Sequence, residues 1–186
     1  MSKLTVVFLK DTTHVLAALT RADPPAAGEQ VSALVGTGLP IGAIDGTSAD
    51  VIVPVANLDA VTVDDQPEVL LDPQGFQVVE DPQQLKPPTV TSVGVVGSSV
   101  ELAISQAQGA SVKVTNVPSA LSLTAVVVLQ KVASSSPAPH ILVTTVTVGT
   151  EKVVAAPGVF VTNEKWNFSA FVQTLRPAVS PAYSVT

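Results

Sequence analysis

Residues 121–130 read LSLTAVVVLQ, and this stretch decides the fold class. Leu and Ala or Val occupy every second position from Leu121 to Leu129, whereas the positions between them begin with Ser and Thr and then become Val. With a period of two, alternate side chains lie on opposite faces of a β-strand. One face is apolar throughout and the other becomes apolar, which predicts a central strand buried on both faces.

Shorter stretches on either side of 121–130 are also predicted to be strands, from the same period or from their Val and Thr content. They are residues 90–96, 100–104, 112–115, 140–148, 151–155 and 166–170. Turn-forming residues separate them at intervals of roughly 8–12 residues, which is typical of an immunoglobulin-like or fibronectin-like β-sandwich. The chain has no Cys, so it lacks the disulfide of antibody domains. We therefore predict the architecture and no family.

The first half of the chain is less regular, but it is also predicted to be built from strands. They are residues 4–9, 31–35, 51–55, 60–63, 69–71 and 76–79, and DPQG at 72–75 predicts a turn that joins the last two into a hairpin. Residues 14–20 are either the second strand of a hairpin with 4–9 or, over 13–21, a short helix capped by Thr13. We expect a small N-terminal β-barrel or open sheet, so the whole chain is all-β.

The charge distribution predicts two domains. Residues 1–88 carry four Lys and Arg against twelve Asp and Glu, whereas residues 89–186 carry five against three. A Pro-rich stretch lies between the halves, and Pro favours an extended connector because it cannot donate to a sheet. We predict an acidic β domain at 1–80, a linker at 81–88 and a β-sandwich at 89–186. The alternative is a long loop within one domain.

Composition excludes several classes of protein. The absence of Cys excludes thiolate metal sites and thiol catalysis, and the formal net charge of −6 argues against a general nucleic-acid binder. No apolar run approaches the roughly 20 residues of a membrane-spanning helix. The short apolar run at 4–9 is not a secretory signal. We expect no cofactor, no nucleic-acid partner, no membrane insertion, and a location in the cytoplasm or within an assembled particle.

Few residues are candidates for catalysis or metal binding. His14 and His140 are far apart in sequence and lack ligands at metal-binding spacing, so we predict a half-exposed His14 beside a turn and a His140 that opens a strand. Asp64 and Asp65 are weak candidates for Ca²⁺, but their spacing fits no EF-hand loop, and solvated turn carboxylates are the simpler interpretation. We therefore predict no catalytic residue and no metal site.

Two aromatic residues are the candidates for an interface. Trp166 shares one face of its predicted strand with Phe168, whereas Phe171 lies on the other face. Phe171 is accordingly predicted either to be an exposed or interface aromatic or to form a second core layer. Trp166 is predicted to be a core aromatic of the sandwich that also serves the interface.

Low charge together with many Val and Thr predicts apolar sheet surfaces that a monomer would expose at the risk of aggregation. We therefore expect a non-enzymatic structural subunit that associates with itself or with other structural subunits. A phage-like or contractile-tail-like particle, in which the chain is a cap, terminator, baseplate or decoration component, fits this character by analogy. The alternative is a β-sandwich binding module that recognises a glycan or a protein, with Ca²⁺ as a possible aid.

Overall fold

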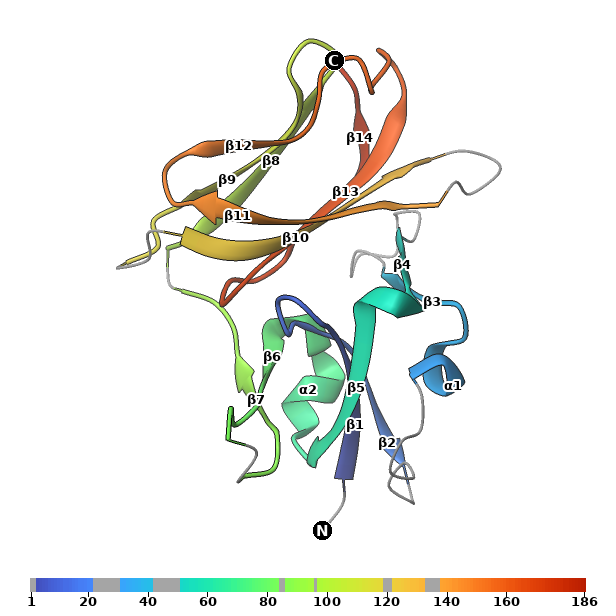
Figure 1. The fold of residues 1–186 in the computed structure, drawn as a ribbon, viewed down its shortest axis with the longest axis vertical. Coiled ribbons are helices and arrows are strands. Elements are labelled where there is room, and N and C mark those ends of the chain that lie inside the picture. The colour runs from blue at the N-terminus through green and yellow to red at the C-terminus, as the bar shows by residue number, and fades with distance from the viewer. Residues whose placement is uncertain are drawn as a thin grey trace. The chain divides into compact units, whose positions relative to one another are not determined.

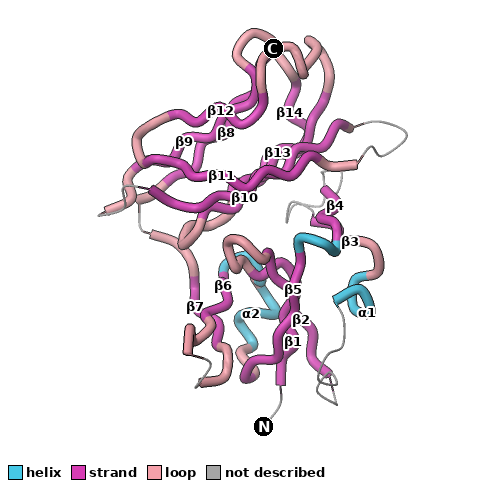
Figure 2. Tube along the Cα trace, in the orientation of Figure 1, coloured by secondary structure: helices cyan, strands magenta, loops and turns pink. Residues whose placement is uncertain are grey.

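The structure is a computed structural model that describes residues 3–21, 31–41, 51–83, 86–95, 97–118, 122–132 and 138–186. The chain is all-β, with several sheets and only short helices in these residues (Figure 2). It divides into two compact units. Unit 1 comprises Met1–Leu39 and Pro54–Gly94, and unit 2 comprises Pro40–Val53 and Val95–Thr186. No helix in the described residues is long and apolar enough to cross a lipid bilayer.

Unit 2 contains a four-stranded antiparallel sheet in the order β11-β10-β13-β14 (Figure 1). Its strands are β10 (Ser122–Lys131), β11 (His140–Thr147), β13 (Lys165–Val172) and β14 (Ala178–Ser184). The strand predicted to be central is β10, which has a neighbour on each side and is buried on both faces from Ala125 to Gln130. This prediction is confirmed.

A second sheet in unit 2 has the order β12-β9-β8. It is formed by β8 (Ser99–Ser105), β9 (Gly109–Thr115) and β12 (Glu151–Ala155). The two sheets share one hydrophobic core, to which β9 contributes Val112 and Val114 and β10 contributes Val127. Trp166, Phe168 and Ala170 on alternate positions of β13 join the same core, as their spacing predicted.

A segment from early in the sequence contacts β10. It contributes β3 (Gly38–Ile41) and β4 (Val51–Pro54), which pair with each other, and its residues Pro40–Val53 belong to unit 2. The backbone N–H of Ile52 donates a hydrogen bond of 3.1 Å to Oε1 of Gln130 on β10. Val51 and Val53 of β4 are buried. The four Gly and one Pro of residues 36–46 favour an extended loop, but residues 38–41 form β3, and residues 42–46 lie outside the described residues.

Unit 1 contains a three-stranded sheet in the order β2-β1-β5, and a β6–β7 hairpin. Its strands are β1 (Lys3–Leu9), β2 (Val15–Arg21), β5 (Leu58–Asp64), β6 (Phe76–Val79) and β7 (Thr89–Ser92). β1 and β2 are antiparallel, so the hairpin alternative for 14–20 is correct and the helix is not. The closed barrel that the sequence also allowed does not form among the described residues, which leaves the open sheet.

Two predicted strands of unit 1 are short helices. Residues 31–35 form α1 (Val31–Val35), which ends at Gly36 with a φ of 67°, a left-handed conformation that Gly adopts readily. Residues 69–71 lie in α2 (Pro67–Leu71), where Pro67 stands at the first helical position. Short 3₁₀ turns, η1 (Val55–Asn57) and η2 (Pro73–Gly75), follow β4 and α2. The predicted 69–79 hairpin is therefore wrong, and β6 pairs with β7 instead.

The pairing of β6 with β7 also brings together the two ends of the Pro-rich stretch. Val79 pairs with Thr89, so the predicted linker at 81–88 lies in sequence between two paired strands, and residues 84 and 85 of it lie outside the described residues. The compact units divide after Gly94, later in the sequence than the linker we predicted. A further difference is β14, which the sequence analysis missed because Pro181 lies within it. Pro is tolerated in an edge strand, and β14 is one.

Candidate functional site

The two sheets of unit 2 meet in two different ways at their two sides. On one side lie the edge strands β11 and β12, which are consecutive in sequence and are joined by a tight turn at residues 148–150. Gly149 in this turn has a φ of 81°, and its N–H donates a hydrogen bond of 2.7 Å to the carbonyl oxygen of Val114 on β9. The turn thus ties β11 to the second sheet at one end.

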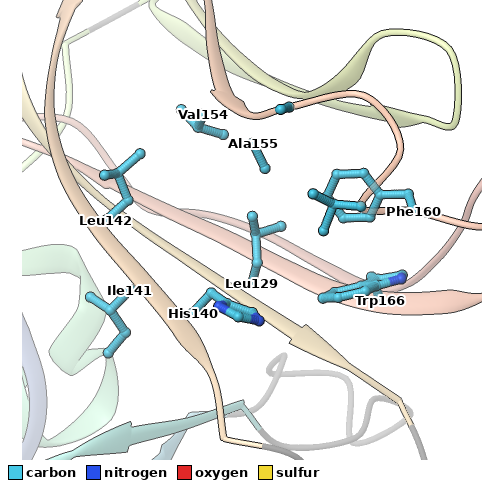
Figure 3. Close-up of a pocket in the computed structure, with 10 residues that line it drawn as sticks. Leu129, His140, Ile141, Leu142, Val154, Ala155, Phe160 and Trp166 are labelled. Carbon is cyan, nitrogen blue, oxygen red and sulfur yellow. The ribbon is translucent and has the colours of Figure 1, made fainter.

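Away from this turn a pocket of about 240 Å³ lies between the two edge strands. Figure 3 shows His140, Ile141 and Leu142 of β11 on one side of it and Val154 and Ala155 of β12 on the other. Leu129 of β10, Trp166 of β13 and Ala156, Val159 and Phe160 from the loop after β12 complete the lining. The lining is therefore almost entirely apolar.

Two aromatic rings of the pocket lining pack on each other. Phe160 stands edge-on to Trp166, with ring centroids 5.0 Å apart and an interplanar angle of 76°. Both rings and Leu129 are buried, and the His140 ring lies 6.5 Å from that of Trp166. Edge-to-face contact is a favourable geometry for aromatic pairs.

Glu164 holds Trp166 in this position. Its Oε2 accepts a hydrogen bond of 3.2 Å from Nε1 of Trp166, and its Oε1 accepts one from Nζ of Lys131. The hydrogen bond from Lys131 lowers the pKa of Glu164, and the bond from Trp166 adds to this effect. The charge pair thus fixes the polar edge of Trp166, so that the indole presents carbon atoms to the pocket.

Exposed apolar side chains lie on the same two edge strands and loop that line the pocket. Among the described residues of unit 2, five of the six large apolar side chains that are exposed lie on β11, on β12 or in the loop after β12. They are Leu142, Val143, Val153, Val159 and Val161. We call the pocket and these five side chains the open side of unit 2. An exposed apolar area of this kind marks a contact surface more often than a free one.

The structure brings one of the two predicted interface residues to the open side. Trp166 lines the pocket and is 5% exposed. Phe171 is fully buried on the other face of β13, so it forms the second core layer that was one of its two alternatives. A role for Phe171 at an interface stays a prediction. Sequence reasoning missed Phe160 and Leu142, although the turn formers at 156–158 mark the loop that positions Phe160.

The candidate calcium ligands lie in unit 1 and are not gathered into a site in the described residues. Asp64 ends β5 and accepts a hydrogen bond of 2.6 Å from Nζ of Lys3, which lowers its pKa. No group of three or more His, Cys, Asp or Glu side chains that could hold a metal ion occurs within the described ranges. Asp65 follows Asp64 as an exposed residue.

The two histidines have different surroundings. His140 is the first residue of β11, as predicted, and reaches the rim of the pocket. His14 was expected to be half-exposed, but it is fully buried because it bridges to Gln77 of β6, which covers the beginning of β2.

The site can bind an apolar group of a partner, because a pocket of this size with aliphatic and aromatic walls accommodates one bulky side chain. Comparisons of the chain with protein-family models, with curated proteins and with solved structures found no match.

Proposed function

We propose that this chain is a non-enzymatic structural subunit of a multi-protein assembly. In this proposal unit 2 is an immunoglobulin-like or fibronectin-like β-sandwich, and its open side contacts neighbouring subunits. The observation that carries the proposal is an apolar pocket between β11 and β12, together with five exposed apolar side chains on these strands and on the loop after β12. Burial of apolar surface drives association, and the centres of interfaces are depleted of charge.

The kind of assembly is proposed from the general character of the chain. A β-rich subunit without Cys and with few charges fits a phage-like or contractile-tail-like particle, where it is a cap, terminator, baseplate or decoration component. The excess of acidic residues before residue 89 and the slight excess of basic residues after it favour contacts between unlike parts of neighbouring copies.

The test is isolation of the tagged full chain from its native source under native conditions, followed by native mass spectrometry. We expect the chain in a complex of fixed stoichiometry. Val159→Glu places a charge on the open side, where Val159 is 49% exposed, and is expected to release the chain from that complex. Leu71→Glu on α2, at a residue 87% exposed in unit 1, is the matched control and should leave the complex intact.

Two results would contradict the proposal. One is a monomer recovered without any partner from the native source. The other is a complex that Val159→Glu leaves at its full stoichiometry.

The alternative of a binding module keeps the pocket as its support. A glycan is bound mainly through hydrogen bonds, but the indole N–H of Trp166 is already donated to Glu164. The aliphatic walls suit an apolar side chain of a protein better. The calcium-assisted form of this alternative predicts a calcium-dependent rise in melting temperature that Asp64→Ala and Asp65→Ala abolish, and an unchanged melting temperature would count against it.

A further inference from the structure

We infer that β11 pairs with β11 of a second copy of this chain, antiparallel and around a two-fold axis. This inference rests on the proposed assembly function and names the first contact within it. The occupant of the open side is thereby a second copy, and the two four-stranded sheets become one continuous sheet.

β11 is a long and regular edge strand. It pairs with β10 over eight consecutive residue pairs, from Ser122 with Thr147 to Leu129 with His140, without a bulge. On its other side β11 has no neighbouring strand in the described part of the chain. A long, regular edge presents a row of backbone N–H and C=O groups, which is a template for another strand.

The other three edge strands of the two larger sheets of unit 2, namely β12, β14 and β8, have features that discourage such pairing. β12 begins with Glu151 and Lys152 and has an irregular register after Val153. β14 includes Pro181, which has no N–H, and its register with β13 is also irregular. β8 carries Glu101. β11 has no Pro, no Lys, no acidic residue and no bulge.

The edge of β8 is also contacted by Tyr183, which lies on β14 of the other sheet. Its hydroxyl donates a hydrogen bond of 2.8 Å to the carbonyl oxygen of Leu102. One acceptor of that edge is therefore already occupied. No side chain in the described residues is seen to occupy the β11 edge in the same way.

The residues of β11 favour a second copy of the chain as the partner. Residues 141–147 read ILVTTVT, so every antiparallel register of β11 with itself within this stretch opposes uncharged residues, nearly all of them β-branched. Cross-strand pairs of such residues stabilise a sheet, whereas like charges directly opposite each other destabilise it. A charged foreign strand would find no counter-charge between Ile141 and Thr147. A two-fold axis uses the same strand on both copies and closes the contact at two chains.

The first experiment measures self-association of the full chain by sedimentation equilibrium. The wild type is expected to form a dimer in the micromolar range, and Val143→Lys is expected to raise the dissociation constant by about tenfold or more, because the two-fold axis brings two ammonium groups close together. Val143 is 45% exposed, so its replacement is compatible with the fold. The matched control is Val79→Lys, at a residue 44% exposed on β6 of unit 1, and it should change the dissociation constant by less than about threefold.

The second experiment does not depend on a disruptive substitution. Because the chain has no Cys, a single Cys introduced at each of 141, 143, 145 and 147 reports only the pairing of that position with itself. Opposed residues of antiparallel strands have Cα atoms about 4.5–5.5 Å apart, which suits a disulfide. We expect the yield of disulfide-linked dimer after oxidation to be high at one position, or at two neighbouring scanned positions, and low at the others. Glu101→Cys on β8 should give a low yield.

Two results would overturn the inference, and they differ from those that would overturn the proposed function. One is a wild type that stays monomeric at about 100 µM, a concentration far above the expected dissociation constant. The other is equal disulfide yield at all four positions and at residue 101. If either occurs while the chain from its native source still forms a complex with other proteins, self-pairing is wrong and the assembly function stands. If the native complex is absent as well, both are wrong.

Discussion

The two sides of unit 2 are both formed by edge strands, but the two sheets are connected differently on each side. On the β8 and β14 side, Tyr183 binds the carbonyl oxygen of Leu102, and the N–H of Gln106 donates a hydrogen bond of 3.0 Å to the carbonyl oxygen of Thr186. On the open side, β11 and β12 are joined at their turn and enclose a pocket farther along. The difference is that hydrogen bonds connect the two sheets on the β8 and β14 side, whereas a pocket separates the edge strands on the open side.

The largest effect is expected from a substitution on β9 that collides with the end of β12. Gly109 has a φ of 84°, and a Cβ placed there would lie 2.0 Å from the carbonyl oxygen of Ala155 at the end of β12. Gly109→Ala is therefore expected to lower the free energy of unfolding by about 3 kcal/mol or more, from overpacking and backbone strain together. Denaturant unfolding measures it.

The control for this substitution is Gly97→Ala. Gly97 also has a positive φ, 80°, but a Cβ there would meet nothing within 4 Å. It isolates the cost of the backbone conformation, about 1 kcal/mol. Equal losses for the two substitutions would show that β12 does not approach Gly109 as described.

The next largest effect is expected on the side of unit 2 formed by β8 and β14. Tyr183→Phe removes the hydroxyl that binds the carbonyl oxygen of Leu102, and should lower the free energy of unfolding by about 1 kcal/mol. Amide exchange should rise in β8 and β14 and stay unchanged in β11. A uniform rise across unit 2 would contradict a bond that acts on this side alone.

A smaller effect on folding is expected from the open side. Val143→Thr changes an exposed side chain, so the free energy of unfolding of the monomer should change by less than about 0.5 kcal/mol. Measurement by denaturant at low protein concentration avoids the contribution of association. A loss as large as that of Tyr183→Phe would mean that this side contributes to the fold of the monomer and is not held for a partner.

The smallest effect depends on pH. The folded-state pKa of Glu164 is lowered below 4.5 by Lys131, so the folded chain binds fewer protons at this group than the unfolded chain. Its contribution to stability is present above pH 4.5 and is lost as the pH falls through the lowered pKa. Glu164→Gln should therefore make stability less dependent on pH below 4.5, as followed by thermal unfolding.

The matched variant for this pH effect is in unit 1. Lys3 lowers the pKa of Asp64 below 3.8, so Asp64→Asn should remove a pH dependence that begins at a lower pH. Identical pH profiles for the wild type and both variants would contradict the two charge pairs.

Much of unit 2 could be predicted because its strands follow a period of two. The alternation at 121–130 identified β10 as the central strand, and the spacing of Trp166, Phe168 and Ala170 assigned them to one face. Short segments were harder to predict. Five residues such as 31–35 or 67–71 are too few to distinguish a strand from one helical turn by apolar residues, and their end signals, Gly36 and Pro67, decided the outcome.

The site was predictable only in part, for a different reason. Trp166 was selected for the strand face that it shares with Phe168, but the pocket depends on where two edge strands separate. The turn at 148–150, which joins these strands, is bonded to Val114, a residue far away in sequence. Periodicity within a strand carries no information about such distances. The same limit hid the hydrogen bond between Ile52 of β4 and Gln130 of β10, which are 78 residues apart in sequence.

The most direct test of the central claim is hydrogen–deuterium exchange of residues 140–147, compared between the isolated monomer and the assembled protein. The account predicts slower exchange in β11 on assembly, with β8 and β14 unchanged, because the open side is the one that a neighbour covers. Equal exchange of β11 in the two states, with new protection on the β8 and β14 side, would contradict it.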